Sequence, residues 1–158
     1  MSLYIFRGLP GAGKSKRARE LADQLHCMLI EPDALLYKGG KYRYTFSDYG
    51  DAVDVCLRIL FDIKMSGLSF PDIVFADVLW CKDDIKELEE LYGEPAKKIT
   101  TLEIDLETAR RRNIHNVSEY DLRFMAEHFQ RIEGDNAVIE DAMDDLKYED
   151  VNDLPEGW

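Results

Sequence analysis

The sequence predicts an α/β fold with a mainly parallel sheet, and two observations lead to this prediction. Short apolar runs, each long enough for a buried strand, alternate along the chain with longer segments of helical periodicity. The first expected strand, residues 3–7, leads directly into the glycine-rich stretch GLPGAGKS at residues 8–15. Strands that alternate with helices are typical of parallel sheets, because parallel neighbours need a crossover connection.

Each expected element follows from a local pattern. Asp48 is expected to cap the second helix and Gly67 to end it, and the glycine- and tyrosine-containing residues 38–47 are expected to form a loop. We expect four or five strands, at about 3–7, 27–30, 73–77, 98–105 and 137–139, with 27–30 and 73–77 buried. We expect helices at about 14–24, 48–65, 83–92 and 106–131, the last with a polar break near 113–118. These elements predict a three-layer α/β/α arrangement.

The composition limits the classes of function. A chain of 158 residues can bury a core without disulfides or metals, and a formal net charge of −12 disfavours binding to a long nucleic acid duplex. The three cysteines form no CxxC pair, which is typical of reduced cysteines in the cytoplasm. No segment is long enough to span a bilayer, so we expect a cytoplasmic protein without a membrane partner.

The glycine-rich stretch contains the complete pattern G-x-x-x-x-G-K-[ST], formed by Gly8, Gly13, Lys14 and Ser15. Such a loop binds phosphates through its backbone N–H groups and through the positive end of the helix that follows. The motif between a strand and a helix predicts a P-loop NTPase fold that binds ATP. The expected nucleotide-binding residues of this segment are Gly8, Leu9, Pro10, Gly11, Ala12, Gly13, Lys14, Ser15 and Lys16.

The same motif predicts a magnesium site. Lys14 is expected to neutralise the β- and γ-phosphates of ATP, and the Ser15 hydroxyl is expected to bind Mg²⁺. Asp77, at the end of an apolar strand, is the expected carboxylate ligand of the ion. Because ligands of parallel sheets gather at the carboxyl ends of the strands, Asp77 and the loop should lie together.

A transferase also needs a base for its acceptor and positive charge over the transferred group. Asp33, directly after the second expected strand, is the candidate general base, with Glu31 as the alternative. Three consecutive arginines, Arg110–Arg112, diverge by about 100° per residue on a helix, so one or two could reach the phosphates. In KYRYTF, residues 41–46, the aromatic side chains could stack a base or pack inward.

These motifs, in this order, resemble the P-loop kinases related to the kinase domain of phage polynucleotide kinase and the ATPase-like AAA_33 group. The resemblance covers about residues 3–131. The segments that carry it are RGLPGAGKS at 7–15, Pro32-Asp33, the apolar strand that ends at Asp77, TARRRN at 108–113 and V-x-x-x-x-L-x-x-M from Val117 to Met125.

The resemblance implies an activity and assigns roles to three residues. The family uses ATP and Mg²⁺ to phosphorylate a hydroxyl, in its best-known members the 5′-hydroxyl of a polynucleotide. Asp33 matches the catalytic base, Asp77 the acid that ends the third strand, and Arg112 the lid arginine that contacts the ATP phosphates. Relatives carry polar residues after that acid and often a second lid arginine; here Val78-Leu79-Trp80 and Ile114-His115-Asn116 stand in those places.

These observations predict a kinase with three possible roles. The first is transfer of the γ-phosphate of ATP to a polynucleotide 5′-hydroxyl, with Lys14, Asp33 and Arg112 as catalytic residues and Arg110 as a further nucleotide ligand. The alternatives are a kinase of a sugar, nucleoside or antibiotic, and a nucleotide-binding module without transfer activity. The expected acceptors are an oligonucleotide end, a nucleotide or a small metabolite. We expect a kinase domain at 1–139, with a lid at about 106–131, and an acidic tail at 140–158. A phage-encoded chain would act in the cytoplasm of its bacterial host.

Overall fold

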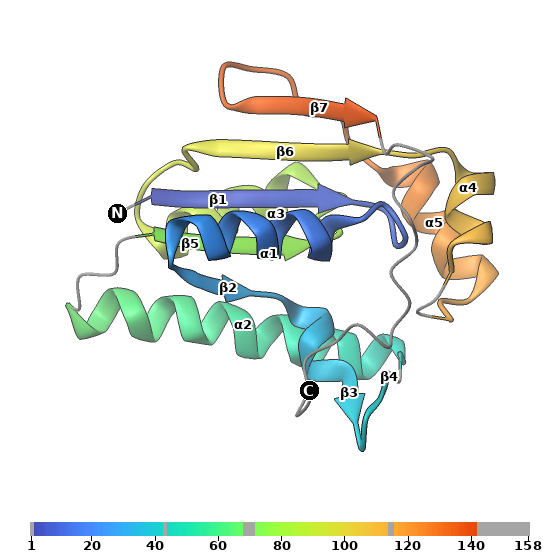
Figure 1. Ribbon diagram of the computed structural model, residues 1–158, viewed down its shortest axis with the longest axis horizontal. Helices are drawn as coiled ribbons and strands as arrows, with labels where there is room; N and C mark the ends of the chain where they lie inside the picture. Colours follow the sequence, from blue (N-terminus) through green and yellow to red (C-terminus); the bar gives the residue numbers. More distant parts are fainter. Residues whose placement is uncertain (1, 43, 68–71, 114–115, 142–158) are drawn as a thin grey trace.

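A five-stranded parallel sheet forms the centre of the molecule (Figure 1). The computed structural model describes residues 2–42, 44–67, 72–113 and 116–141. The strand order is β2-β5-β1-β6-β7, and every neighbouring pair runs parallel. The strands are β1 (Ser2–Gly8), β2 (Met28–Ile30), β5 (Asp72–Asp77), β6 (Lys98–Glu103) and β7 (Ala137–Asp141).

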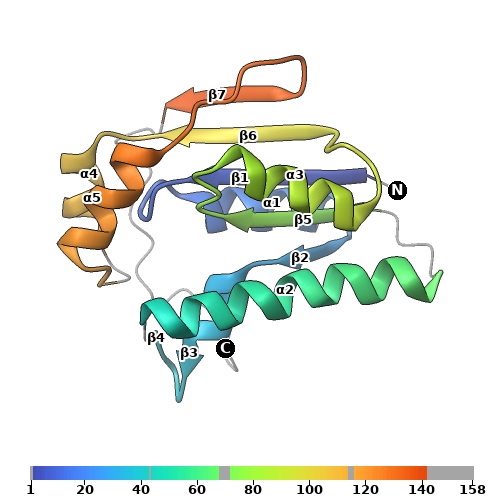
Figure 2. The ribbon, with the colours of Figure 1, turned by 180° about the vertical axis from the view of Figure 1, so that it is seen from behind.

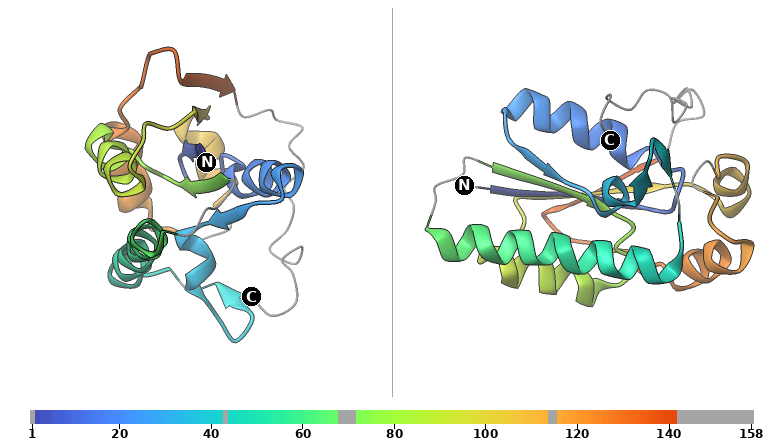
Figure 3. Two further views of the ribbon diagram at one scale, coloured as in Figure 1. Left: turned by 90° about the vertical axis from the view of Figure 1, so that its left-hand side faces the viewer. Right: turned by 90° about the horizontal axis from the view of Figure 1, so that it is seen from below.

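Helices cover both faces of this sheet. Seen edge-on, α1 (Lys14–Leu25) lies on one side, while α2 (Phe46–Ser66) and α3 (Lys82–Tyr92) lie on the other (Figure 3), which is the side that faces the viewer in Figure 2. Two short helices, α4 (Leu106–Arg111) and α5 (Glu119–His128), stand at the carboxyl end of the strands. The expected three-layer α/β/α architecture is therefore confirmed, as is the polar break in the last helical region.

Two apolar layers of the core pack against the sheet, one on each side, and a third cluster, which includes Leu9, Ala109 and Leu122, joins the glycine-rich loop to α4 and α5. Leu3 and Ile5 of β1 pack with Ile73 and Phe75 of β5 in the cluster that also contains α3 residues. The intervening strand residues point the other way and pack against the small α1 residues, in a cluster of Phe6, Ala18, Ala22, Val74 and Ala76. Because both faces are covered, the interior strand β5 is apolar and buried from Ile73 to Ala76, as expected.

The prediction of a buried strand at 27–30 is wrong. The strand β2 is the edge of the sheet next to β5, and its first residue, Met28, is 37% exposed. An apolar run of four residues does not reveal whether one or both of its edges are paired. The parallel pairing of β2 with β5 places the residues that follow Ile30 next to the carboxyl end of β5.

The segment 38–47 is more ordered than expected. It contains most of a small antiparallel hairpin, β3 (Tyr37–Lys38) and β4 (Lys41–Tyr42), turned at Gly39-Gly40. The predicted cap at Asp48 is also wrong. Thr45 is the N-cap of α2, and its side-chain oxygen accepts a 3.1 Å hydrogen bond from the Asp48 backbone N–H. Thr-x-x-Asp places the acid in the first helical turn, where it complements the helix dipole. Gly67 ends α2 as expected.

The last described strand passes the expected domain boundary at residue 139. The strand β7 continues to Asp141, and Glu140 forms an ion pair with Arg17 of α1. The remainder of the expected tail, 142–158, lies outside the described residues. Within the described segments, no helix combines the length and apolar composition that crossing a membrane requires.

Candidate active site

The glycine-rich loop connects the end of β1 to the start of α1 and is closely surrounded by backbone. A Cβ at Gly8 would lie 2.7 Å from the Leu102 carbonyl oxygen of β6. Gly11 has φ +87°, and a Cβ there would lie 3.0 Å from the Cβ of Arg112. Side chains at these two positions would force the loop away from β6 and α4, so the glycines are required by close approach as well as by the backbone conformation.

Lys14 is buried inside this loop. Its ammonium group donates hydrogen bonds to the carbonyl oxygens of Gly8, at 2.9 Å, and Leu9, at 3.0 Å. Burial lowers the pKa of Lys14, and the negative charges of Asp33, Asp77 and Glu31 oppose that shift. The loop lysine therefore lies within the electrostatic field of the three carboxylates at the neighbouring strand ends.

Those three carboxylates gather because β2 and β5 are parallel neighbours. Ile30, the last residue of β2, pairs with Phe75, so the residues that follow β2 emerge beside the end of β5. Glu31 and Asp77 are buried, and Asp33 is partly buried in the 3₁₀ helix η1 (Pro32–Leu36). The carboxyl ends of the strands, where a metal ligand and a base are expected, do bring Asp33 and Asp77 together with the loop.

Each carboxylate accepts a hydrogen bond from a hydroxyl group. Ser15 of the loop donates to Glu31, and Tyr49 of α2 donates to Asp77, which also accepts from the Val78 backbone N–H at 2.8 Å. The Tyr42 hydroxyl of the hairpin donates to Asp33 at 3.0 Å. The sequence pattern gave Tyr42 only as an aromatic side chain that could stack a base or pack inward, and it did not indicate Tyr49. Their positions in aromatic segments next to the carboxylate motif were the available signal.

The electrostatics of this cluster favour a cation. Burial, with the nearby charge of Asp33, raises the pKa of Asp77 to about 7, and burial also raises the pKa of Glu31. The donor set of one hydroxyl and carboxylate oxygens is the type that Mg²⁺ prefers, so Ser15 and Asp77 fit the expected ion. Within the described part of the chain, no three His, Cys, Asp or Glu residues form a metal-holding cluster by themselves.

The arginines of the TARRRN segment separate, as their helical spacing requires. Arg112, at the C-terminal end of α4, lies directly against Gly11 of the loop. Arg110 instead forms an ion pair with Glu119 of α5, with an Nη2–Oε1 distance of 2.6 Å. Arg111 contacts the Thr108 hydroxyl at 3.4 Å. Of the two expected nucleotide ligands, the fold brings Arg112 to the loop and directs Arg110 to α5. The expected ligand Lys16 lies in the first turn of α1 and is partly buried.

A fully buried arginine holds the segment that follows Asp77. Arg7 of β1 donates two hydrogen bonds to the Leu79 carbonyl oxygen, at 2.9 and 2.8 Å, and one to the Gln130 carbonyl oxygen at 2.7 Å. Its guanidinium also lies 4.2 Å from the centre of the Phe129 ring. The segment after Asp77 is therefore anchored to β1 through its backbone carbonyl groups. A charged residue inside the apolar run before Gly8 was the signal for this role.

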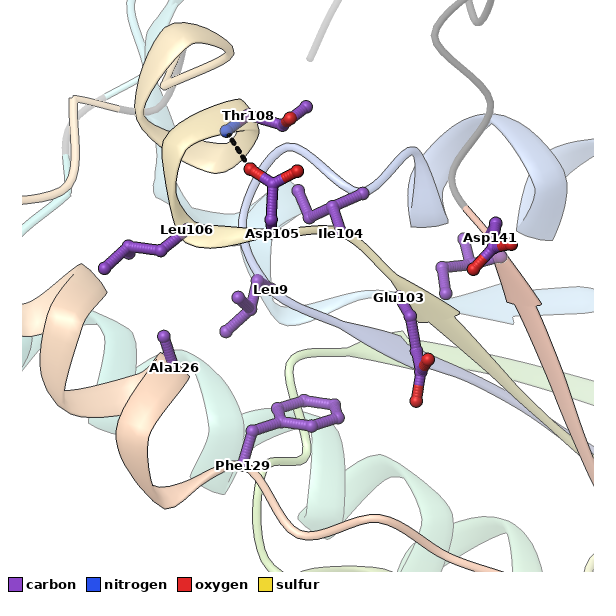
Figure 4. A pocket seen from close by; sticks show the side chains of 10 residues that line it. Leu9, Glu103, Ile104, Asp105, Leu106, Thr108, Ala126, Phe129 and Asp141 are labelled. Carbon is purple, nitrogen blue, oxygen red and sulfur yellow. Dashed lines mark hydrogen bonds between the residues drawn. The ribbon is translucent and has the colours of Figure 1, made fainter.

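A pocket of about 650 Å³ is lined by residues of β6 and β7 (Figure 4), and in the strand order these strands stand on the opposite side of β1 from β2 and β5. It opens at the ends of β6 and β7 and borders the glycine-rich loop at Leu9. Its walls combine apolar side chains with carboxylates, namely Leu9, Leu102, Ile104, Leu106, Ala126, Phe129, Glu103, Asp105 and Asp141, together with Thr108. The loop thus separates an acidic region at β2 and β5 from a mixed pocket at β6 and β7.

The fold resembles those of solved structures that include kinases. A gluconokinase from Sinorhizobium meliloti 1021 has a TM-score of 0.63 at 18% sequence identity, over 89% of this chain and 82% of that protein. A Chloroflexus aurantiacus protein assigned as a kinase has a TM-score of 0.65 at 15% identity, over 96% of this chain and 92% of that protein. Kti12 from Chaetomium thermophilum, in complex with ADP-AlF3, has a TM-score of 0.61 at 19% identity, over 91% of each chain.

No protein-family model matches the sequence, and no curated protein matches it. At the identities of these solved structures the likeness is one of fold. It confirms the predicted fold class, an α/β P-loop NTPase.

Proposed function

We propose that the chain is an ATP-dependent kinase that transfers the γ-phosphate of ATP to a hydroxyl acceptor. One observation carries the proposal. Lys14, inside the glycine-rich loop, lies near the carboxylates of Asp33 and Asp77 at the carboxyl ends of the strands. The likeness to a gluconokinase supports this reaction class, and the likeness to Kti12 in complex with ADP-AlF3 supports nucleotide binding.

The nucleotide would bind on the loop side. Backbone N–H groups of the loop and the N-terminus of α1 would hold the phosphates, with Lys14 and Arg112 adding positive charge. Ser15 and Asp77 would hold Mg²⁺, which when bound supplies positive charge to the phosphate oxygens. The pocket beside Leu9 would take the nucleoside part of ATP, because it is the cavity that continues from the loop away from Asp33.

The acceptor would bind on the other side of the loop, near Asp33. Its hydroxyl oxygen attacks the γ-phosphorus, a new O–P bond forms, and the bond from that phosphorus to the ADP oxygen breaks. The hydroxyl proton moves to the Asp33 carboxylate. The Tyr42 hydroxyl donates a hydrogen bond to this carboxylate and holds it in place. Asp33 is preferred over Glu31 because Asp33 is only partly buried, whereas Glu31 is buried and is bound by Ser15, a proposed ligand of Mg²⁺.

The resemblance of the motifs to polynucleotide kinases favours a 5′-hydroxyl oligonucleotide end as the acceptor. A small-molecule acceptor is the second candidate, favoured by the likeness to a gluconokinase. The pairing of Arg110 with Glu119 favours the third, a nucleotide-binding module, because it removes one expected phosphate ligand. For all three we propose one kinase-like domain at 1–139, in which α4 and α5 act as the lid, followed by the acidic tail.

A transfer screen tests the proposal. The purified protein is incubated with Mg²⁺ and ATP labelled at the γ-phosphate, together with 5′-hydroxyl oligonucleotides and a panel of sugars, nucleosides and antibiotics. Label should move to at least one acceptor, and Asp33→Asn should slow that transfer by about 10²-fold. Binding of Mg²⁺–ATP without transfer to any acceptor would reject the kinase and leave the binding module.

A further inference from the structure

Tyr49 lies in the first turns of α2, beside the carboxylate proposed to bind Mg²⁺. Its backbone N–H donates a 2.9 Å hydrogen bond to the carbonyl oxygen of Thr45, the N-cap of the helix. Its side chain is partly buried, and its ring centroid lies 5.9 Å from that of Tyr44. The start of the helix and this ring contact therefore determine where the Tyr49 hydroxyl meets the end of β5.

The Asp77 carboxylate accepts both of its hydrogen bonds on the same oxygen. The Tyr49 hydroxyl donates to Oδ1, and the Val78 backbone N–H donates to the same atom at 2.8 Å. Among the described residues, no hydrogen bond reaches the other oxygen, Oδ2. Because a carboxylate is planar, two donors on one oxygen fix the direction of the second oxygen and leave it available to a cation.

The main chain around Asp77 is held against the glycine-rich loop. Asp77 pairs with Arg7 in the parallel register of β5 and β1, and the Gly8 N–H donates to the Val78 carbonyl oxygen at 3.3 Å. The backbone thus fixes the distance between Asp77 and the loop. It does not fix the terminal torsion of the aspartate side chain, which is broad in the absence of a partner. Tyr49 restricts that torsion.

The two proposed ligands of Mg²⁺ have different hydrogen-bond partners. Ser15 donates to Glu31, which precedes η1, and not to Asp77. The described residues give Asp77 one partner that is distant in the sequence, Tyr49, while its other donor belongs to the next residue along the chain. The orientation of Asp77 therefore depends on α2, independently of the contact that holds Ser15.

We propose that Tyr49 is a positioning residue of the magnesium site, whose hydroxyl holds Oδ1 of Asp77 so that Oδ2 is presented to the ion. This inference rests on the Mg²⁺ site of the proposed function and deepens it. Groups that orient a metal ligand typically contribute about 10- to 100-fold to metal affinity. A purely structural hydrogen bond would instead affect thermal stability, with no selective effect on binding of the metal complex.

Titration of ATP in saturating Mg²⁺ and in EDTA separates the metal site from the phosphate cradle. Tyr49→Phe removes the hydroxyl and keeps the ring. It should lower the affinity for Mg²⁺–ATP by about tenfold and leave the affinity for metal-free ATP within about twofold of the parent's. Tyr92→Phe is the matched control, because Tyr92 is a buried tyrosine in the last turn of α3 whose hydroxyl has no hydrogen-bond partner among the described residues. It should change neither affinity.

A double-mutant cycle tests whether the effect of Tyr49 passes through Asp77. Asp77→Ala removes the carboxylate, so adding Tyr49→Phe to it should lower the affinity for Mg²⁺–ATP by less than about twofold more. Melting temperatures establish that each variant is folded. If Asp77→Ala does not fold, the comparison of Tyr49→Phe in Mg²⁺ and in EDTA decides by itself.

Three results would overturn the inference while the kinase proposal stands. These are an unchanged affinity of Tyr49→Phe for Mg²⁺–ATP, an equal fall in affinity with and without the metal, and additive effects of the two substitutions in the cycle. The titrations need no acceptor, so they are independent of the transfer screen. A metal-selective effect of Tyr49→Phe without transfer to any acceptor would support the inference and reject the kinase. If the parent binds no Mg²⁺–ATP, both fail.

Discussion

The two sides of the glycine-rich loop differ in chemistry and in how they are built. On one side, backbone N–H groups, Lys14 and Arg112 surround a cradle that glycines keep open. On the other side, three carboxylates accept hydrogen bonds from Ser15 and from two tyrosines. In the proposed function, the first arrangement would stabilise the phosphates of ATP, and the second would accept the proton of the acceptor hydroxyl. The difference indicates a division of labour between nucleotide binding and acceptor activation.

The largest expected effect comes from removing the cation of the loop. Lys14→Met should reduce the rate of phosphate transfer by about 10³-fold, because it removes charge stabilisation at the transferred group. The measurement is kcat with the best acceptor of the screen. Lys86→Met, at an exposed position of α3, is the matched control. A fall of less than tenfold would show that Lys14 does not act on the phosphates.

Removing the proposed base should affect the rate without affecting the fold. Asp33→Asn should reduce kcat by about 10²-fold, within the range for a general base. The Tyr42 hydroxyl can still donate to the new amide oxygen, so the melting temperature should stay close to that of the parent. Asp51→Asn, exposed on α2, is the control. A rate close to the parent's would move the role of base to Glu31.

A third comparison tests the close approach of the loop to α4. Gly11→Ala places a methyl group 3.0 Å from the Arg112 Cβ at φ +87°, whereas Gly40→Ala has a similar φ of +77° and no atom within 4 Å. Both variants carry backbone strain of about 1–3 kcal/mol. Gly11→Ala should also lower the affinity for Mg²⁺–ATP, by about tenfold on the scale of such local distortions. Equal ATP affinity in the two variants would contradict the tight cradle.

The smallest expected effect concerns the hydroxyl that holds Asp33. Tyr42→Phe removes the 3.0 Å hydrogen bond but keeps the ring against Tyr37. A hydrogen bond to a charged group contributes about 1.5–3 kcal/mol, and only part of that affects the rate, so kcat/KM should fall by about three- to tenfold. Tyr120→Phe, 77% exposed on α5, should have no effect. A Tyr42→Phe variant as active as the parent would remove this residue from the acceptor side.

The same division explains what the sequence could and could not predict. The cradle is made by eight consecutive residues, so covalent spacing alone fixes Gly8, Lys14 and Ser15 relative to one another. Asp33 and Asp77 were predictable because each directly follows an apolar strand, and the parallel order brings strand ends together. The α/β/α layers were predictable because short apolar runs alternate along the chain with segments of helical periodicity.

The side of the loop that carries the carboxylates could not be predicted in full, because residues from separate segments of the chain form it. The sequence does not reveal that Tyr42 donates to Asp33 and Tyr49 to Asp77. These hydrogen bonds depend on how the hairpin and α2 pack against the strand ends. The engagement of Arg110 by Glu119 likewise depends on the packing of α4 against α5. By contrast, the cap at Thr45 was readable from its spacing to Asp48 and was missed.

Equilibrium binding of Mg²⁺–ATP to three proteins tests the division of labour most directly. Calorimetric titration of the parent, Lys14→Met and Asp33→Asn should give equal affinities for the parent and Asp33→Asn. It should give an affinity lower by about tenfold or more for Lys14→Met, since that variant alone loses a charged contact to phosphate. If Lys14→Met binds Mg²⁺–ATP as tightly as the parent, or if Asp33→Asn loses the nucleotide, the two sides of the loop do not have the separate roles assigned to them.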